Sequence, residues 1–210
     1  FHNLHGYYLN IKVLFAFLEK VNIPVVWTLH DCWSFTGHCA YYSAVKCEKW
    51  KESCFNCPQK KEYPKSWFVD NSRENYELKK NLFCSLKNVI IVPVSEWLGN
   101  EVKQSFLGKY PTRVIYNGID LATFRKKTQT YLKTTKFILL SLATTWSKRK
   151  GFDDFIKLSS LLKKDELIVL VGLTKSQLKK LPKNIIGIER TESQEELAQL
   201  YSQAGIVLSL

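Results

Sequence analysis

Apolar positions along this chain follow two alternating patterns, which together predict an α/β fold. Short apolar runs of strand length recur, and between them apolar residues are spaced three or four apart, as on one face of a helix. The expected strands cover residues 24–29, 89–94, 112–116, 137–142, 167–172, 184–188 and 206–210, and the expected helices cover residues 7–22, 66–86, 96–106, 151–162, 174–181 and 193–204. Strands that alternate with helices are typical of parallel βαβ units with right-handed crossovers.

Details of the pattern predict how some of these elements pack and begin. Residues 24–29 are continuously apolar, as in a strand covered on both faces. Ser95 is expected to cap the helix that follows it, and Ser193 with Glu196 to form a capping box. The buried face of the first helix is expected to consist of its spaced apolar residues, Leu9, Val13, Ala16, Phe17 and Leu18.

The two runs of alternating elements predict two doubly wound lobes. Residues 121–135 are polar and basic without a clear period, so we interpret them as a linker between an N-terminal lobe, residues 1–120, and a second lobe, residues 136–210. Residues 30–65 also have no clean period. A segment of that length inside a compact domain is usually functional, or is held by something other than a core.

The composition gives the chain a strong positive charge, and the residues at its two ends are unusual. The formal net charge is +12, which favours an anionic partner such as a nucleic acid, a phosphorylated ligand or an anionic membrane surface. No apolar run approaches the ~20 residues of a membrane span. The chain contains no methionine and ends on the apolar run Gly205–Leu210, so we expect it to be a piece of a longer protein.

Reactive side chains concentrate in residues 27–59, directly after the first predicted strand. His30 and Asp31 follow that strand, where a parallel sheet delivers residues to a ligand crevice. Four cysteines follow in the order Cys39-x7-Cys47-x6-Cys54-x2-Cys57. Four thiolates can hold a structural zinc ion, which would stabilise a loop that lacks a core. Reduced thiols and disulfides remain open alternatives, with Cys32 and His38 as replacement ligands and Cys84 interpreted as a core residue.

The second lobe begins with a buried strand that runs into a strongly basic turn. Lys148, Arg149 and Lys150 precede Gly151, where a helix is expected to begin. Backbone N–H groups at a helix start, together with Arg and Lys side chains, can bind phosphate. The alternative is a solvated basic turn. No G-x-G-x-x-G segment and no Walker loop is present, so neither a dinucleotide site of that kind nor a P-loop is supported.

An ordered series of motifs resembles the family 4 retaining glycosyltransferases, which use nucleotide-sugars. The series is His30-Asp31, Val94-Ser95-x-Trp97-Leu98, Val114-Ile-Tyr-Asn-Gly-Ile-Asp120-x-x-x-Phe124, Arg149-Lys-Gly-Phe-Asp153 and Glu196-Leu-Ala-x-Leu-Tyr201-Ser-x-Ala204. The resemblance covers nearly the whole chain, in order. It implies a GT-B fold, in which two Rossmann-like lobes face each other across a cleft.

The resemblance also implies roles for individual residues. His30 corresponds to the family's histidine that faces the donor sugar, and we place Asp31 beside it in the candidate catalytic pair, with orienting His30 or capping a turn as the alternative. Lys150 corresponds to the lysine that binds the donor diphosphate, and Gly172 to the turn near the nucleotide. The family's arginine five residues before that lysine is replaced by Thr145, so Arg149 is the expected substitute.

The implied function is hexosyl transfer from a nucleotide-sugar to a saccharide or lipid-linked acceptor, with retention, in surface polysaccharide biosynthesis. The resemblance implies a cytoplasmic enzyme without a catalytic metal, and the lysine-rich surface suggests peripheral docking on an anionic membrane leaflet. Two family parts are not in the sequence: the glycine-rich loop would precede Phe1, and a pair of spaced glutamates would follow Leu210.

Two alternatives remain open. One is a zinc-stabilised nucleic-acid-binding protein, which the strand–helix alternation and the lack of an aromatic-basic repeat disfavour, so no nucleic-acid partner is expected. The other is a GT-B-like protein without catalytic activity.

Overall fold

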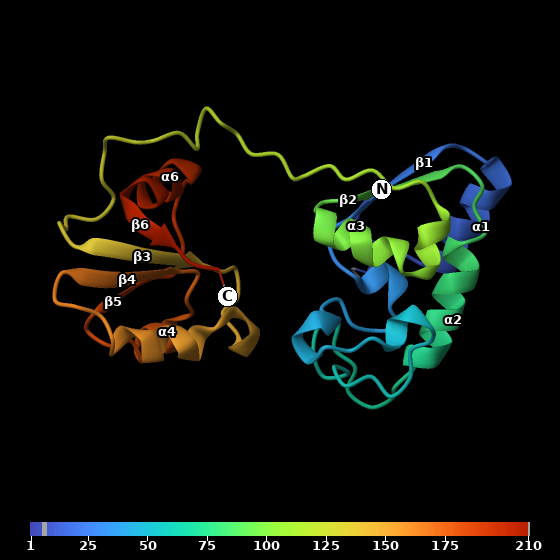
Figure 1. Ribbon diagram of the computed structural model, residues 1–210, viewed down its shortest axis with the longest axis horizontal. Helices are drawn as coiled ribbons and strands as arrows, with labels where there is room; N and C mark the ends of the chain where they lie inside the picture. Colours follow the sequence, from blue (N-terminus) through green and yellow to red (C-terminus); the bar gives the residue numbers. More distant parts are fainter. Residues whose placement is uncertain (6–7, 210) are drawn as a thin grey trace. The chain divides into compact units, whose positions relative to one another are not determined.

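A computed structural model describes residues 1–5 and 8–209 of the chain (Figure 1). It divides into two compact units, unit 1 from Phe1 to Asn117 and unit 2 from Gly118 to Leu210. Both units are mixed α/β with parallel strand pairing, which confirms the predicted fold class. The predicted helix start at Tyr7 and the predicted strand end at Leu210 lie outside the described residues.

Unit 2 contains a four-stranded parallel sheet with the order β5-β4-β3-β6. Its strands are β3 (Phe137–Leu142), β4 (Glu166–Val171), β5 (Ile185–Ile188) and β6 (Ala204–Val207). The chain adds β4 and β5 on one side of β3 and then returns to add β6 on the other side (Figure 1). This reversal of direction between β3 and β6 is the topological switch point of a doubly wound sheet.

Helices cover both faces of this sheet, as expected for a doubly wound lobe. The helices are α4 (Phe152–Ser159), the short α5 (Lys175–Leu178) and α6 (Gln194–Gln203). Phe155 of α4 packs with Ile168 and Leu170 of β4, whereas Leu200 of α6 packs with Val169 and its neighbours on the opposite face. Figure 1 shows α4 and α6 on opposite sides of the sheet.

The capping box predicted at the start of α6 is half formed. Ser193 accepts a hydrogen bond from the N–H of Glu196, as a capping serine should. The Glu196 carboxylate, however, accepts from the N–H of Glu192 rather than Ser193, so the predicted capping box is only half formed. A capping box that was not predicted joins Thr174 and Gln177 at the start of α5.

Unit 1 is built around two parallel strands, β1 (Val25–Leu29) and β2 (Val89–Pro93). The predicted third strand at residues 112–116 is an irregular edge segment, which forms an isolated bridge to Ile91 and donates backbone hydrogen bonds from Arg113 and Ile115 to β2. Val26 is 55% exposed, so the described residues leave one face of β1 partly open. The prediction that both faces of β1 are covered is therefore wrong.

The first helix, α1 (Ile11–Val21), buries a different face from the one predicted. Phe15 and Leu18 are buried, and Ile11 and Leu14 pack against the same core. Of the predicted face only Leu18 is buried, whereas Val13 is 66% and Phe17 56% exposed. The helix has apolar residues on two adjacent faces, and packing against β1 and α2 selects the one centred on Phe15.

The remaining helices of unit 1 are α2 (Ser72–Phe83) and α3 (Glu96–Lys103), and the N-cap of α3 is Ser95 as predicted. The rings of Phe15, Trp27 and Phe83 meet within 6 Å and join α1, β1 and α2 into one core. Phe68, predicted within the second helix, precedes α2 and is 91% exposed.

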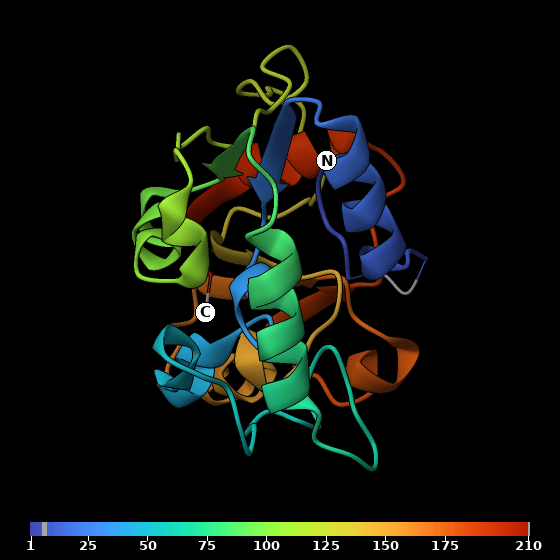
Figure 2. The same ribbon diagram turned by 90° about the vertical axis from the view of Figure 1, so that its right-hand side faces the viewer.

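Residues 30–71 contain only short 3-10 turns, at Trp33–Phe35, Tyr42–Val45 and Lys49–Lys51. Phe35, Tyr42 and Trp50 form an aromatic cluster among these turns. Figure 2 shows this segment gathered beside α2 at one end of unit 1.

The segment interpreted as a linker makes several contacts with α6. The Gln203 side-chain oxygen accepts hydrogen bonds from the N–H groups of Tyr131 and Leu132, and the Ser202 hydroxyl accepts from Lys127. Within residues 1–5 and 8–209, no helix combines the length and apolarity that crossing a bilayer requires.

Candidate functional site

His30 lies at the carboxyl end of β1 and is paired with a second histidine. Its Nε2 atom lies 3.0 Å from Nδ1 of His2, and the two rings stack with centroids 5.3 Å apart. One nitrogen of the pair must donate and the other accept, so each ring fixes the tautomer and orientation of the other. His30 is exposed, so its ring is available to a ligand.

The Asp31 carboxylate interacts with His5 and with the backbone of Trp33 rather than with His30. Its carboxylate lies 3.3 Å from Nε2 of His5, with both side chains about nine-tenths buried, and it accepts a hydrogen bond from the N–H of Trp33. Asp31 therefore caps the turn that follows β1. Neither His2 nor His5 was predicted as a site residue; in the sequence they are marked only by their spacing, three residues apart at the start of the chain.

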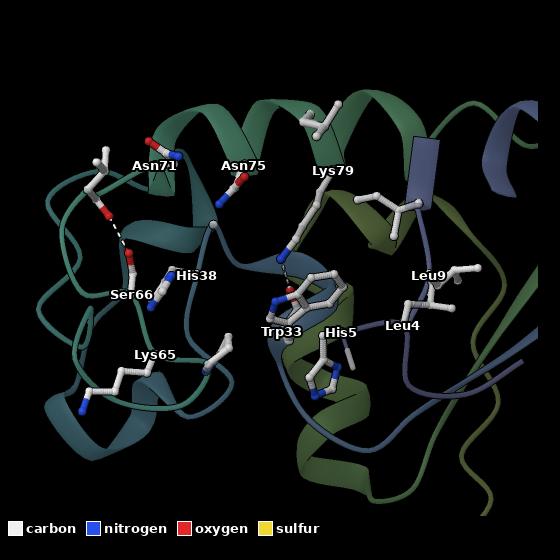
Figure 3. A pocket seen from close by; sticks show the side chains of 15 residues that line it. Leu4, His5, Leu9, Trp33, His38, Lys65, Ser66, Asn71, Asn75 and Lys79 are labelled. Carbon is white, nitrogen blue, oxygen red and sulfur yellow. Dashed lines mark hydrogen bonds between the residues drawn. The ribbon is translucent and has the colours of Figure 1, made fainter. Parts of the chain in front are cut away.

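A cavity of about 410 Å³ opens beside the turn that follows β1, within unit 1 (Figure 3). Asn71, Asn75 and Lys79 approach it from one side of α2, and Trp33 with His5 lines the facing wall. His38, Lys65 and Ser66 complete the polar end. Its volume is in the range of small-molecule sites, and amide, imidazole and indole groups suit a polar ligand with an apolar face.

Burial lowers the pKa values of two residues that line the cavity, His38 and Lys79. Desolvation lowers the pKa of His38 despite the contact of its Nε2 with the Lys60 carbonyl, so His38 is neutral at pH 7. Lys79 is 3% exposed; its ammonium group donates to the carbonyls of Trp33 and Thr36 and lies 3.4 Å from the Trp33 ring centre. Burial lowers the pKa of Lys79, while the nearby thiols of Cys54 and Cys39 oppose that shift.

The four spaced cysteines meet around a second, small cavity. Cys39, Cys47, Cys54 and Cys57 all line it, together with Trp50. The hydrogen bond between the Cys39 and Cys57 thiols raises the pKa of Cys39 and lowers that of Cys57 to about 7. No group of three or more His, Cys, Asp or Glu side chains in the described chain is arranged to hold a metal ion, so the predicted zinc site is not formed in this conformation.

The other two cysteines lie away from this cavity. Cys32 is buried beside Tyr42, and burial raises its pKa to about 12. Cys84 ends α2, half-buried, with its thiol 3.4 Å from the Phe106 carbonyl oxygen. Neither replaces one of the four spaced cysteines.

In unit 2 the basic residues form a 3-10 turn, Lys148–Lys150, at the carboxyl end of β3. Lys148 and Arg149 are exposed and Lys150 is half-buried. Gly151 adopts a left-handed conformation (φ 68°) and caps α4, which begins at Phe152 rather than at Gly151 as predicted. The turn thus lies at the switch point between β3 and β6, the place where open α/β sheets bind their ligands.

Gly172 and Trp146 hold the base of this turn. Gly172 follows β4 with φ 95°, and a Cβ atom on it would lie 1.7 Å from the carbonyl oxygen of Ala143, the first residue after β3. The buried Trp146 indole donates to the carbonyl of Val171, at the end of β4. The loop that carries the basic residues is therefore tied to the neighbouring strand at two points.

Comparison with known proteins relates the chain to sugar-transferring enzymes. It is 39% identical over 131 residues to a protein of Escherichia coli named putative colanic acid biosynthesis glycosyl transferase WcaC. That match covers 59% of this chain and 31% of the relative, so the chain spans about a third of the curated relative it matches. No family model matches the chain.

Two solved structures share the fold. Sucrose-phosphate synthase from Thermosynechococcus elongatus matches with a TM-score of 0.58 and 14% identity, over 94% of this chain and 52% of its own. HepE from Anabaena, solved in complex with UDP-glucose, matches with a TM-score of 0.54 and 16% identity, over 94% and 49%. The likeness places the chain in the GT-B fold class, as predicted.

Proposed function

We propose that the chain is part of a glycosyltransferase that moves a hexosyl group from a nucleotide-sugar to a saccharide or lipid-linked acceptor, with retention. The observation that carries this proposal is the position of the Lys148–Lys150 turn at the switch point of a doubly wound sheet. The similarity to WcaC and the UDP-glucose complex of HepE support the same reaction class and the nucleotide-sugar donor.

In this proposal Arg149 and Lys150 bind the donor diphosphate. A guanidinium group can engage two phosphate oxygens at once, and a lysine ammonium adds a point charge. During transfer, negative charge builds on the departing nucleoside diphosphate, and fixed cations stabilise it. Gly172 contributes by allowing the end of β4 to pack against Ala143, which supports the base of the basic loop.

Unit 1 is proposed to contribute His30 and the acceptor pocket. His30 would hydrogen-bond the transferred sugar through an imidazole whose orientation His2 fixes. The cavity that contains Trp33, Asn71 and Asn75 is proposed to bind the acceptor, because aromatic faces stack on sugar rings while amides bind hydroxyl groups. The name of the relative supports a polysaccharide as the product.

We also propose a cytoplasmic location at an anionic membrane surface, with α1 as the docking element. Val13, Phe17 and Val21 are exposed at four-residue spacing, and Lys12 and Lys20 are exposed on the same helix. An apolar stripe with flanking lysines suits an anionic leaflet. Co-sedimentation with anionic vesicles, lost in Phe17→Ser and absent with neutral vesicles, is expected; equal sedimentation of the variant would contradict it.

Donor binding tests the central proposal. Isothermal titration of the chain with UDP and UDP-glucose is expected to show binding that Lys150→Ala weakens by about 10- to 100-fold, since a charge-assisted hydrogen bond contributes ~1.5–3 kcal/mol. Lys164→Ala is the matched control, because Lys164 is an exposed lysine just before β4, at the amino end of the strands rather than the carboxyl end.

The same titration distinguishes the competing functions. Salt-steep binding of DNA or RNA, with no binding of nucleoside diphosphates, would reject the proposal in favour of a nucleic-acid-binding protein. Binding of the donor without any sugar transfer or donor hydrolysis by the whole enzyme would indicate a GT-B-like protein that lacks catalysis.

A further inference from the structure

The cysteine cavity of unit 1 has no role in the proposed transfer reaction, although its geometry is specific. Cys39, Cys47, Cys54 and Cys57 come from three separate loops and all line one small cavity. The thiols of Cys39 and Cys57 are within hydrogen-bonding distance of each other, and Cys47 and Cys54 lie near enough to act on Cys39 electrostatically. Three short loops therefore bring four sulfur atoms to one cavity.

The surrounding segment has little regular secondary structure, although Phe35, Tyr42 and Trp50 pack into the core beside it. Between Thr36 and Gln59 the chain forms only two 3-10 turns, Tyr42–Val45 and Lys49–Lys51. Lys46 and Asn56 each adopt a left-handed conformation directly before a cysteine, so Cys47 and Cys57 each follow a sharp bend. Short loops without regular structure are where a bound metal supplies folding energy.

Hydrogen-bond donors surround the sulfur atoms. The N–H of Gly37 donates to Sγ of Cys54 at 3.1 Å. The indole N–H of Trp50, whose ring also lines the cavity, is buried without an acceptor in the described residues. Buried donors are normally paired, and a negatively charged sulfur is an acceptor for them.

The charge balance supports anionic sulfur atoms at this place. Lys79 is 3% exposed, and no carboxylate in the described residues lies within ion-pair distance of it. The acidic groups that act on it most strongly are the Cys54 and Cys39 thiols. A nearby anion stabilises the charged form of a buried lysine. Zinc bound by four thiolates carries a net charge of −2, from +2 and four times −1, and would supply that anion.

We propose that Cys39, Cys47, Cys54 and Cys57 bind one structural Zn²⁺ ion, with Lys79 as the buried counter-charge of the zinc–thiolate centre. Each thiol that is still protonated loses its proton to solvent as its sulfur binds the metal, so up to four protons are released per ion. The thiols must rotate toward one another, because the present conformation does not hold a metal ion. The centre is structural, since four protein ligands leave no open position for a substrate. It does not depend on the proposed glycosyltransferase activity.

Metal analysis of the protein purified under reducing conditions tests this proposal. We expect about one zinc per chain, and replacement by Co²⁺ should give the visible spectrum of a tetrahedral cobalt–thiolate centre. Cys57→Ser is expected to lose metal, whereas Cys84→Ser should keep it, because Cys84 lies beside Phe106 rather than at the cavity.

Two results would overturn the proposal. One is a metal-free protein in which all six thiols titrate freely and added Co²⁺ gives no thiolate spectrum. The other is a Cys39–Cys57 disulfide in the protein isolated without reductant, together with no zinc after reduction. The Co²⁺ spectrum of the unmodified chain keeps the test valid even if Cys57→Ser does not fold.

Discussion

Replacing Gly172 by alanine should selectively destabilise unit 2. Gly172 has φ 95°, a conformation that side chains rarely tolerate, and its N–H bonds to the Ile188 carbonyl, so the backbone cannot simply rotate away. The added Cβ would meet the Ala143 carbonyl oxygen at 1.7 Å, about half an ordinary contact distance. Either the end of β4 separates from β3, or the basic loop that starts at Ala143 moves.

The cost can be estimated from two contributions. An unfavourable positive-φ conformation costs roughly 1–2 kcal/mol for a non-glycine residue, and forced displacement in a packed region costs about 1–3 kcal/mol. Together these give ~2–5 kcal/mol. For a unit of roughly 100 residues, this lowers the melting temperature by about 10 °C or more. Differential scanning calorimetry measures the shift, and hydrogen exchange of the β3 and β4 amides localises it to unit 2.

Gly118→Ala is the matched control, because nothing lies within 4 Å of a Cβ atom built on Gly118. Its melting temperature should stay close to that of the unmodified chain. If Gly172→Ala matched Gly118→Ala in both melting temperature and UDP binding, the close packing of β4 against the basic loop would be refuted. A normal melting temperature with lost UDP binding would instead show that the loop absorbs the displacement.

Three further changes test other parts of the structure. Ser95→Ala removes the acceptor for the Leu98 N–H and should lower the free energy of unfolding by ~1 kcal/mol in urea titration; no change would contradict the cap. Gly37→Ala places a Cβ 2.0 Å from the Ser72 carbonyl oxygen and 2.6 Å from Cys54, so it should destabilise unit 1 and reduce zinc content, unless the cysteine loops move independently of α2. His2→Ala should weaken UDP-glucose binding but leave UDP binding unchanged if His2 orients His30 toward the sugar; equal weakening of both ligands would refute that role.

The candidate site was only partly predictable. The basic turn could be located because a largely apolar strand precedes it, and strand ends are where α/β sheets bind ligands. The sequence also identified the four cysteines by their spacing. It did not identify His2, His5 or Lys79, because each acquires its role through a partner more than 20 residues away: His30, Asp31 and the carbonyl of Trp33.

The sequence by itself determined the elements whose local pattern is unambiguous. The pattern of residues 137–142 predicts a buried strand, and these residues form β3. Ser95 is predicted as a helix N-cap and is the N-cap of α3. Such features depend on neighbouring residues alone, since strand burial and helix capping are short-range interactions.

Tertiary packing decided those features for which the local sequence pattern allows more than one arrangement. The first helix has two adjacent apolar faces, and only contact with Trp27 and Phe83 selects the face centred on Phe15. The order β5-β4-β3-β6 likewise comes from long-range pairing, and it is this order that places the Lys148–Lys150 turn at a ligand-binding edge. The same holds for the cysteines, because their convergence depends on how three loops pack around Trp50.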